Sequence, residues 1–205
     1  MDGLTFLKKL MHFHPMPVVI ISSLAQHSCQ TAVQALEAGA VEVLAKPAGP
    51  YSVGDLRTAL AAKIRAAAAA RGCRAVAPQA PLPAVTPATL LAGSHKIIAI
   101  GASTGGTEAI ASVLRAMPKE APGILVVQHI PPIFSAAFAS RLNGLCAIDV
   151  EEAADGDALR PGLALIAPGD FHMVLRKENG GYFVNIKTGP PVCYQRPSVD
   201  VLFFP

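Results

Sequence analysis

The first 71 residues alternate between helical patterns and short, mainly apolar runs. Helical patterns cover 2–12, 28–38 and 52–71, and the apolar runs between them cover 18–21 and 40–45. The β-branched run at 18–21 predicts a strand that is buried on both faces of a parallel sheet. The order helix, strand, helix, strand, helix is typical of the carboxyl part of a doubly wound α/β domain.

A second alternation of strands and helices begins after residue 95. Apolar runs at 96–100 and 123–127 predict strands, and helical patterns at 107–117 and 131–143 follow them. A further short strand is expected at 146–150. This order again predicts a parallel sheet with helices on its faces.

Turn signals dominate residues 151–190. Asp-Gly, Pro-Gly and Gly-Gly pairs separate short apolar stretches. These stretches predict short antiparallel strands around 163–166, 172–175 and 182–186. Ser198 is the expected N-cap of a helix that continues into the apolar run at the end of the chain.

The two alternating regions are separated by a segment of different composition. Residues 72–94 hold four prolines among Ala, Thr and Gly and few large apolar residues. A loop of this length is unusual inside one domain, whereas Pro-rich segments commonly join two. We therefore predict a first domain over 1–71, a linker over 72–94 and a second domain over 95–205.

Composition narrows the class of protein. Of 205 residues, 52% are hydrophobic and 15% are charged, which is the composition of a folded chain and not of a disordered one. The net charge of +3 is small and dispersed, so it gives no case for nucleic acid. No apolar run approaches the ~18–20 residues of a spanning helix, and no signal peptide is recognisable. We expect a cytoplasmic protein without membrane insertion.

The cysteines do not indicate a metal or a disulfide framework. The four lie far apart and form no CxxC pair, which favours free thiols in a reducing compartment; they are Cys29, Cys73, Cys146 and Cys193.

Ser103 is the first candidate for chemistry. It follows the predicted strand at 96–100, within a Gly-rich turn that opens a helix. Backbone N–H groups of Thr104, Gly105 and Gly106 at that helix N-terminus suit a developing oxyanion. The letters also satisfy G-x-S-x-G, the pattern of a nucleophile elbow. A phosphate-binding loop or a simple tight turn is the alternative, although neither the P-loop nor the dinucleotide fingerprint is present.

A serine nucleophile needs a base, and His129 is the best placed of the six histidines. It follows the strand at 123–127, so it should lie at the same carboxyl edge of the sheet as Ser103. A surface histidine is the alternative. His172 also follows turn residues but could equally be structural.

No residue stands out as the group that orients the base. Five aspartates are available, and none follows a predicted strand in a convincing motif; they are Asp149, Asp155, Asp157, Asp170 and Asp200. The acidic cluster at 151–157 could suggest a cation site, but its spacing matches no EF-hand loop and a solvated turn is favoured.

Four blocks in order resemble the catalytic domain of the chemotaxis protein-glutamate methylesterase (CheB) family. They are IAIGASTGGTEA at 98–109, VVQHIP at 126–131, APGDFHM at 167–173 and RPSVDVLF at 196–203. Upstream, MDGLTFL at 1–7, PVVIISS at 17–23 and AGAVEVLAKP at 38–47 resemble the second half of a response-regulator receiver domain of the flavodoxin-like fold. Receiver, linker and esterase together are the architecture of that family.

The resemblance implies a role for each matching residue. Ser103 is implied as nucleophile and His129 as general base, with Thr104 and Gly105 around the oxyanion. Ser22 and Lys46 match the receiver's switch residues. The implied reaction is hydrolysis of glutamyl methyl esters, and deamidation of glutamines, on methyl-accepting chemoreceptors, without metal or organic cofactor. A chemotaxis histidine kinase is the implied phosphoryl donor.

The chain also departs from the family's pattern. The receiver's phospho-acceptor aspartate should precede the block at 1–7, and the third member of the catalytic triad is expected beyond Pro205. The resemblance therefore implies a chain truncated at both ends, with an incomplete receiver and a doubly wound methylesterase sheet lacking its C-terminal end. Two alternatives remain: a weak or inactive fragment that binds a receptor or adaptor, and a general hydrolase of small esters. The second is less favoured because the good histidine follows soon after the serine.

Overall fold

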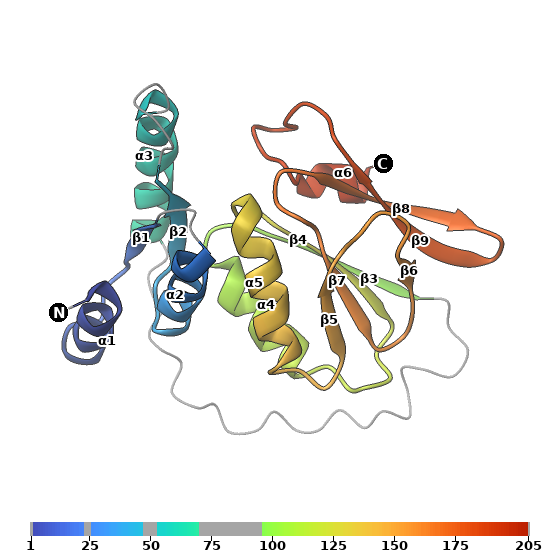
Figure 1. Cartoon of the computed structure of the whole chain (residues 1–205), viewed down its shortest axis with the longest axis horizontal. Helices are drawn as coiled ribbons and strands as arrows, with labels where there is room; N and C mark the ends of the chain where they lie inside the picture. The colour runs from blue at the N-terminus through green and yellow to red at the C-terminus, as the bar shows by residue number, and fades with distance from the viewer. Residues whose placement is uncertain (1, 23–25, 47–52, 70–95, 205) are drawn as a thin grey trace. The chain divides into compact units, whose positions relative to one another are not determined.

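A computed structural model describes residues 2–22, 26–46, 53–69 and 96–204. The contacts within the chain divide it into two compact units, Met1–Ala80 and Pro81–Pro205 (Figure 1). The predicted linker at 72–94 lies outside the described residues. None of the helices in the described part of the chain is long and apolar enough to cross a membrane.

The described residues of the first unit form a two-stranded parallel sheet and three helices. In chain order they are α1 (Gly3–Phe13), β1 (Val19–Ser22), α2 (Gln26–Glu37), β2 (Glu42–Ala45) and α3 (Val53–Ala69). Asp2 is the N-cap of helix α1, and its carboxylate accepts a hydrogen bond from the N–H of Thr5 at 2.9 Å. The element order confirms the helix–strand alternation expected from the sequence.

Strand β1 is less buried than its sequence predicts. Its residues are half-buried, and Ile21 is 39% exposed. Strand β2 is its hydrogen-bonded neighbour in the described two-stranded sheet, with Val19 opposite Glu42. A β-branched sequence suits a buried strand, but how far the strand is buried depends on the strands and helices that pack against it.

The second unit is built on a four-stranded, wholly parallel sheet in the order β3-β4-β7-β5. These strands are β3 (Ile97–Ala102), β4 (Gly123–Gln128), β5 (Asp149–Glu152) and β7 (Leu163–Ile166). Helices α4 (Gly106–Arg115) and α5 (Pro132–Asn143) follow β3 and β4, as the periodicity predicts. Strands β4 and β7 are buried throughout, because they lie in the middle of the sheet.

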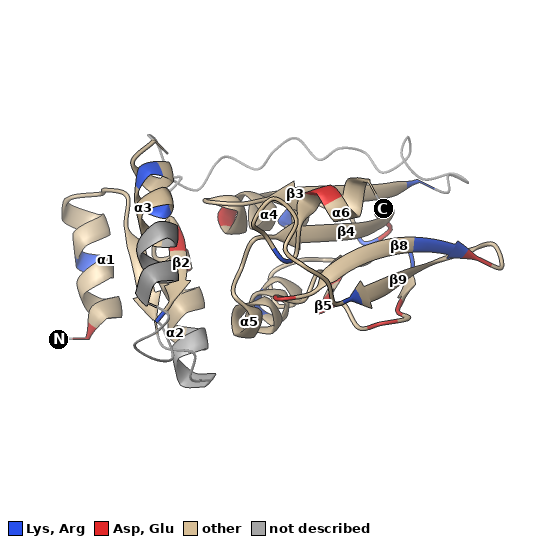
Figure 2. Ribbon diagram, turned by 90° about the horizontal axis from the view of Figure 1, so that it is seen from above, with Lys and Arg blue, Asp and Glu red and all other residues tan. Residues whose placement is uncertain are grey.

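One face of this sheet is covered by segments from the last part of the described chain. A three-stranded antiparallel sheet in the order β6-β9-β8 and the short helix α6 (Val199–Phe203) lie there (Figure 1). Its strands are β6 (Ala158–Leu159), β8 (His172–Glu178) and β9 (Gly181–Lys187). One cluster joins Leu125 of β4, Leu165 of β7, Met173 of β8 and Leu202 of α6. Strands β8 and β9 form a hairpin whose free end is charged, with Lys and Arg beside acidic residues (Figure 2).

Two predicted strands differ in the structure. The run at 163–166 was expected to be antiparallel, but β7 is parallel and central. Its continuous apolar sequence is typical of a buried parallel strand, and the turn pairs on either side were misleading. The strand expected at 146–150 begins at Asp149, because the N–H of Cys146 still bonds to the carbonyl of Leu142 at the end of α5.

The fold brings the ends of three strands to one edge. Strands β3, β4 and β7 are adjacent and parallel, so the segments that follow them meet at the carboxyl edge of the sheet. Helix α6 packs closely there: a Cβ at Gly101 would lie 2.4 Å from a methyl carbon of Val199. A glycine is therefore needed in β3 for the last helix to approach.

Candidate active site

The turn after β3 carries Ser103 into helix α4. The N–H of Gly106 donates to the carbonyl of Ser103 at 2.7 Å and closes the turn. Gly105 is the N-cap, with φ of 76°, a left-handed conformation that glycine adopts readily. Ser103 itself is not among the described residues with positive φ, so the turn differs from a strained nucleophile elbow. Its side chain is exposed at the edge of the sheet.

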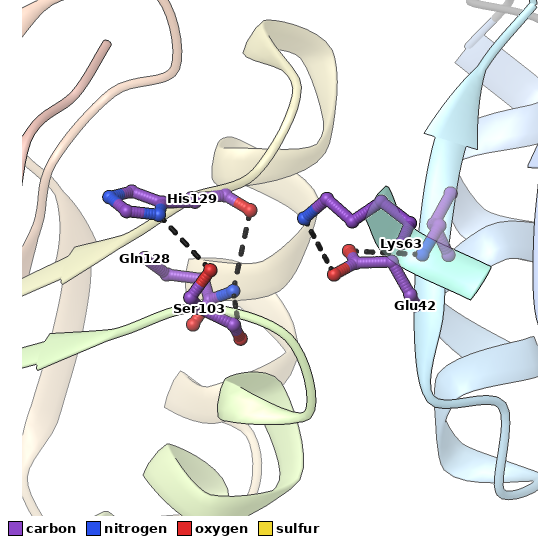
Figure 3. Close-up of polar contacts among 6 residues, drawn as sticks. Glu42, Lys63, Ser103, Gln128 and His129 are labelled. Atoms are coloured by element: carbon purple, nitrogen blue, oxygen red, sulfur yellow. Dashed lines mark hydrogen bonds and ion pairs between the residues drawn. The ribbon is translucent and has the colours of Figure 1, made fainter. Parts of the chain in front are cut away.

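His129 lies beside this turn, as the strand order predicts. Its backbone N–H donates to the carbonyl of Ala102 at 3.2 Å, which holds the ends of β3 and β4 together. Its Nδ1 lies 3.1 Å from the Oγ of Ser103 (Figure 3). For Nδ1 to accept the serine proton, the imidazole must carry its own proton on Nε2. In that tautomer the pair has the geometry of a nucleophile and its base.

The segment after β7 supports the residues next to His129. A Cβ at Gly169 would lie 2.3 Å from the Cα of Pro132, so the two backbones are in direct contact. The Oγ of Ser135 donates to the carbonyl of Pro132 at 2.7 Å and accepts from the N–H of Gly169 at 2.9 Å. This buried hydroxyl therefore ties the start of α5 to the loop that follows β7.

His172 has a structural environment, one of the two readings that the sequence left open. It is 5% exposed. Its Nδ1 accepts from the N–H of Ser198 at 3.2 Å, and its Nε2 lies 3.1 Å from the carbonyl oxygen of Pro190. Accepting at Nδ1 leaves the proton on Nε2, which donates to that carbonyl. The imidazole thus binds both ends of the segment 190–198. Ser198 is the N-cap of α6 as predicted, although its side chain makes no capping bond.

The middle of segment 190–198 is a tight turn. Reciprocal backbone bonds of 3.1 and 3.0 Å join Val192 and Gln195. Cys193 and Tyr194 between them have φ of 50° and 62°, and Tyr194 is 97% exposed. The side-chain hydrogen bond to Asp200 raises the pKa of the Cys193 thiol, because the nearby carboxylate disfavours the thiolate.

The five aspartates considered as orienting groups have other partners. Asp149 pairs with Arg160 at 2.8 Å, Asp157 accepts from the N–H of Ala154 at 2.7 Å, Asp170 pairs with Arg196 at 2.6 Å, Asp155 bonds to Asn185 and Ile186, and Asp200 bonds to Cys193. The two N–H donors hold the pKa of Asp155 below its usual value. The cluster at 151–157 thus serves the turn, and the described residues contain no group of three possible metal ligands.

Ser22 and Lys46, which the resemblance implies as switch residues, lie together in the first unit. Ser22 ends β1, and Lys46 directly follows β2. The N–H of Lys46 donates to the carbonyl of Ser22 at 2.7 Å, so both residues lie at the carboxyl edge of the two-stranded sheet. Near the start of β2, Glu42 forms a 2.8 Å ion pair with Lys63 of α3 (Figure 3).

Sequence reasoning missed Gln128. Its side chain is 2% exposed and lies between the turn of Ser103 and the backbone of His129 (Figure 3). The available signal was a polar amide that closes the buried run of β4 directly before the candidate base. Ser135 was also missed, since a helical serine gives no sequence signal of its tertiary partner.

The fold and the pair define a class: a parallel α/β domain with a serine and a histidine in hydrogen-bond contact at the carboxyl edge of its sheet. The family model for CheB methylesterase matches residues 98–204. A protein-glutamate methylesterase/protein-glutamine glutaminase of Syntrophus aciditrophicus is 54% identical over 205 residues, covering 99% of this chain and 60% of that protein. The chain therefore belongs to the CheB methylesterase family.

Further relatives agree. A protein of the same name from Salmonella choleraesuis is 50% identical over 209 residues, covering 99% of this chain and 58% of its own. The crystal structure of the Thermotoga maritima CheB methylesterase catalytic domain matches with a TM-score of 0.52 and 40% identity, over 54% of this chain and 59% of that one. This likeness confirms the predicted fold class of the second unit. The chain spans about 60% of the length of these curated relatives.

Proposed function

We propose that this chain carries the machinery of a protein-glutamate methylesterase that acts on methylated chemoreceptors in the cytoplasm, and that it also deamidates glutamines there. The observation that carries the proposal is the 3.1 Å contact between Ser103 Oγ and His129 Nδ1. The names of the relatives support glutamate methyl esters and glutamines of proteins as the reacting groups, and the resemblance to the family supports chemoreceptors as the proteins that carry them. A binding module without catalysis would not need this contact, so the enzyme is favoured over an inactive docking fragment.

The chemistry follows from the positions of these atoms. His129 Nδ1 takes the proton from Ser103 as Oγ bonds to the ester carbonyl carbon. The N–H of Gly106 is engaged by the Ser103 carbonyl, so the N–H groups of Thr104 and Gly105 are the proposed donors to the oxyanion. When the tetrahedral intermediate collapses, the C–O bond to the methoxy group breaks and the imidazolium protonates the leaving methoxide.

Water completes the cycle. His129 takes a proton from water as it attacks the acyl-serine, and the proton returns to Oγ when the glutamate is released. A glutamine follows the same steps, with ammonia as the leaving group in place of methanol.

Methanol release from methylated receptor membranes tests this function. We expect Ser103→Ala to abolish release by the 205-residue chain, because the attacking oxygen is removed. Ser140→Ala is the matched control, since Ser140 is an exposed serine on α5. Release by Ser103→Ala at the rate of the Ser140→Ala control would exclude the assigned nucleophile.

We also infer that the first unit is part of a receiver domain and that a histidine kinase is the phosphoryl donor of the whole protein. Support comes from the parallel pairing of β1 with β2 and from the placement of Ser22 and Lys46 at one edge.

A further inference from the structure

Gln128 is a buried polar side chain that contacts the backbone of both reacting residues. It is the last residue of β4, opposite Ala102 in the register with β3, and it directly precedes His129. Only 2% of its surface is exposed. Because its side chain is buried beneath the turn that presents Ser103, Gln128 cannot contact the substrate or solvent directly.

Its amide fixes the direction of one carbonyl. The Nε2 of Gln128 donates to the carbonyl of Ser103 at 2.9 Å and lies 3.4 Å from the carbonyl of His129. The Ser103 carbonyl also accepts from the N–H of Gly106 at 2.7 Å. A carbonyl oxygen has two lone pairs, so this one is saturated by two donors from the interior side of the turn.

The planar peptide transmits this constraint to the next N–H. In a trans peptide the carbonyl of one residue and the N–H of the following residue point in opposite directions. Because the Ser103 carbonyl is held toward Gln128 and Gly106, the N–H of Thr104 is aimed away from them. That N–H is one of the two proposed oxyanion donors.

The contacts determine the orientation of the Gln128 amide, and this orientation leaves its oxygen without a hydrogen-bond partner among the described residues. The Oε1 of Gln128 is buried and has no hydrogen-bond partner among the described residues. Reversing the amide would set Oε1 against the Ser103 carbonyl, oxygen to oxygen, so the donor must face Ser103. An unsatisfied buried acceptor lowers the stability of the folded chain, which a residue serving stability alone would avoid.

Gly106 belongs to the same arrangement. A Cβ at this position would lie 2.2 Å from Oε1 of Gln128 and 2.6 Å from the Cβ of Ala102. Contacts of that length do not occur, so a side chain at 106 would displace the amide. The second glycine of the Gly105-Gly106 pair is thus explained by Gln128, whereas the first is explained by its positive φ.

We propose that Gln128 is a positioning residue for the Ser103–His129 reaction: it pins the Ser103 carbonyl and thereby aims the Thr104 N–H at the developing oxyanion. This inference rests on the proposed esterase function. It concerns the orientation of a donor, so its effect belongs in the transition state and not in substrate binding.

The test replaces the donor while keeping the volume. In Gln128→Met the amide is lost, and we expect kcat for methanol release to fall about 10²-fold, the usual effect of losing one oxyanion donor, with KM within about twofold. Asn143→Ala is the matched control. It removes a 2.9 Å bond to the N–H of Val150, which lies away from the pair, so it lowers stability without lowering kcat. Melting temperatures are measured for all variants.

A second variant keeps the test decisive if Gln128→Met does not fold. Glutamate is isosteric with glutamine, and its carboxyl can donate to the Ser103 carbonyl only when protonated. The kcat of Gln128→Glu, divided by that of the original chain at each pH, should therefore rise as the pH falls.

The two proposals fail separately. Labelling of Ser103 by a fluorophosphonate probe reports the nucleophile itself. Labelling that persists in Ser103→Ala removes the proposed function. Loss of labelling in Ser103→Ala, together with a folded Gln128→Met whose kcat stays within about threefold, or a flat pH ratio for Gln128→Glu, overturns the positioning role alone.

Discussion

Replacing Gly169 with alanine should separate the two loops that support the base. The new Cβ would lie 2.3 Å from the Cα of Pro132, where ordinary contacts begin at 3.4 Å. The two backbones must therefore part by about 1.1 Å, the difference between these distances. The displaced atoms belong to main chain three residues after His129, so no side-chain rotation can relieve the contact.

The expected effects follow from that displacement. Overpacking of this kind costs about 1–3 kcal/mol, and a loss near 2 kcal/mol lowers the melting temperature of a unit of this size by about 8 °C. A shift of ~1 Å near the reacting groups can reduce the rate about 10²-fold. Circular dichroism melting measures the first effect, and the rate of fluorophosphonate labelling at Ser103 measures the second.

Gly144→Ala is the control for this substitution. Gly144 has φ of −74°, and its new Cβ would meet its nearest atom at an ordinary 3.5 Å. We expect this variant to melt and label like the original chain. If Gly169→Ala also melts within about 1 °C of it and labels at the same rate, the contact between the loops does not support the base and the reasoning is wrong.

Three further predictions test other contacts. Asp155→Asn should lower the melting temperature at neutral pH. Because the pKa of Asp155 is lowered from 3.8 in the folded chain, its contribution is present above pH 3.8 and is lost as the pH falls through the folded value, so the difference in melting temperature between variant and original chain should shrink as the pH falls below 3.8. Ser135→Ala should cost about 1–3 kcal/mol in urea unfolding, because the buried N–H of Gly169 loses its acceptor; an unchanged midpoint would contradict this. Lys63→Met should cost about 3–5 kcal/mol, because Glu42 is only 7% exposed and loses its cation; hydrogen exchange in β2 measures it, and unaltered protection would refute it.

The sequence was sufficient for most of the elements and for the central pair, but it did not predict the two-residue strand β6 (Ala158–Leu159). Continuous apolar runs locate the buried parallel strands, and period-3.6 patterns locate the helices, because burial is a local constraint on sequence. Ser103 and His129 could be brought together without coordinates, since both follow adjacent parallel strands and such ends share one edge.

The remaining features depend on contacts between distant residues. The direction of β7 could not be predicted, because a short apolar run between turn signals suits either a hairpin or a buried parallel strand. From the sequence alone, Gln128 is only the polar residue at the end of a strand. Its role depends on the hydrogen bond to Ser103, which lies 25 positions earlier in the chain. His172 likewise acquires its structural role only from Pro190 and Ser198.

Because the imidazole of His172 holds both ends of segment 190–198, an exposed side chain at the tip of this segment can be exchanged. Both ends of the segment bind one buried side chain, so the anchorage does not depend on the residues at the tip. Val192 and Gln195 close the turn with reciprocal backbone bonds, and Cys193 is bonded to Asp200 of α6, whereas Tyr194 is 97% exposed. Exchange of Tyr194 should therefore leave the sheet and the reacting pair undisturbed, which makes this position suitable for attaching a label.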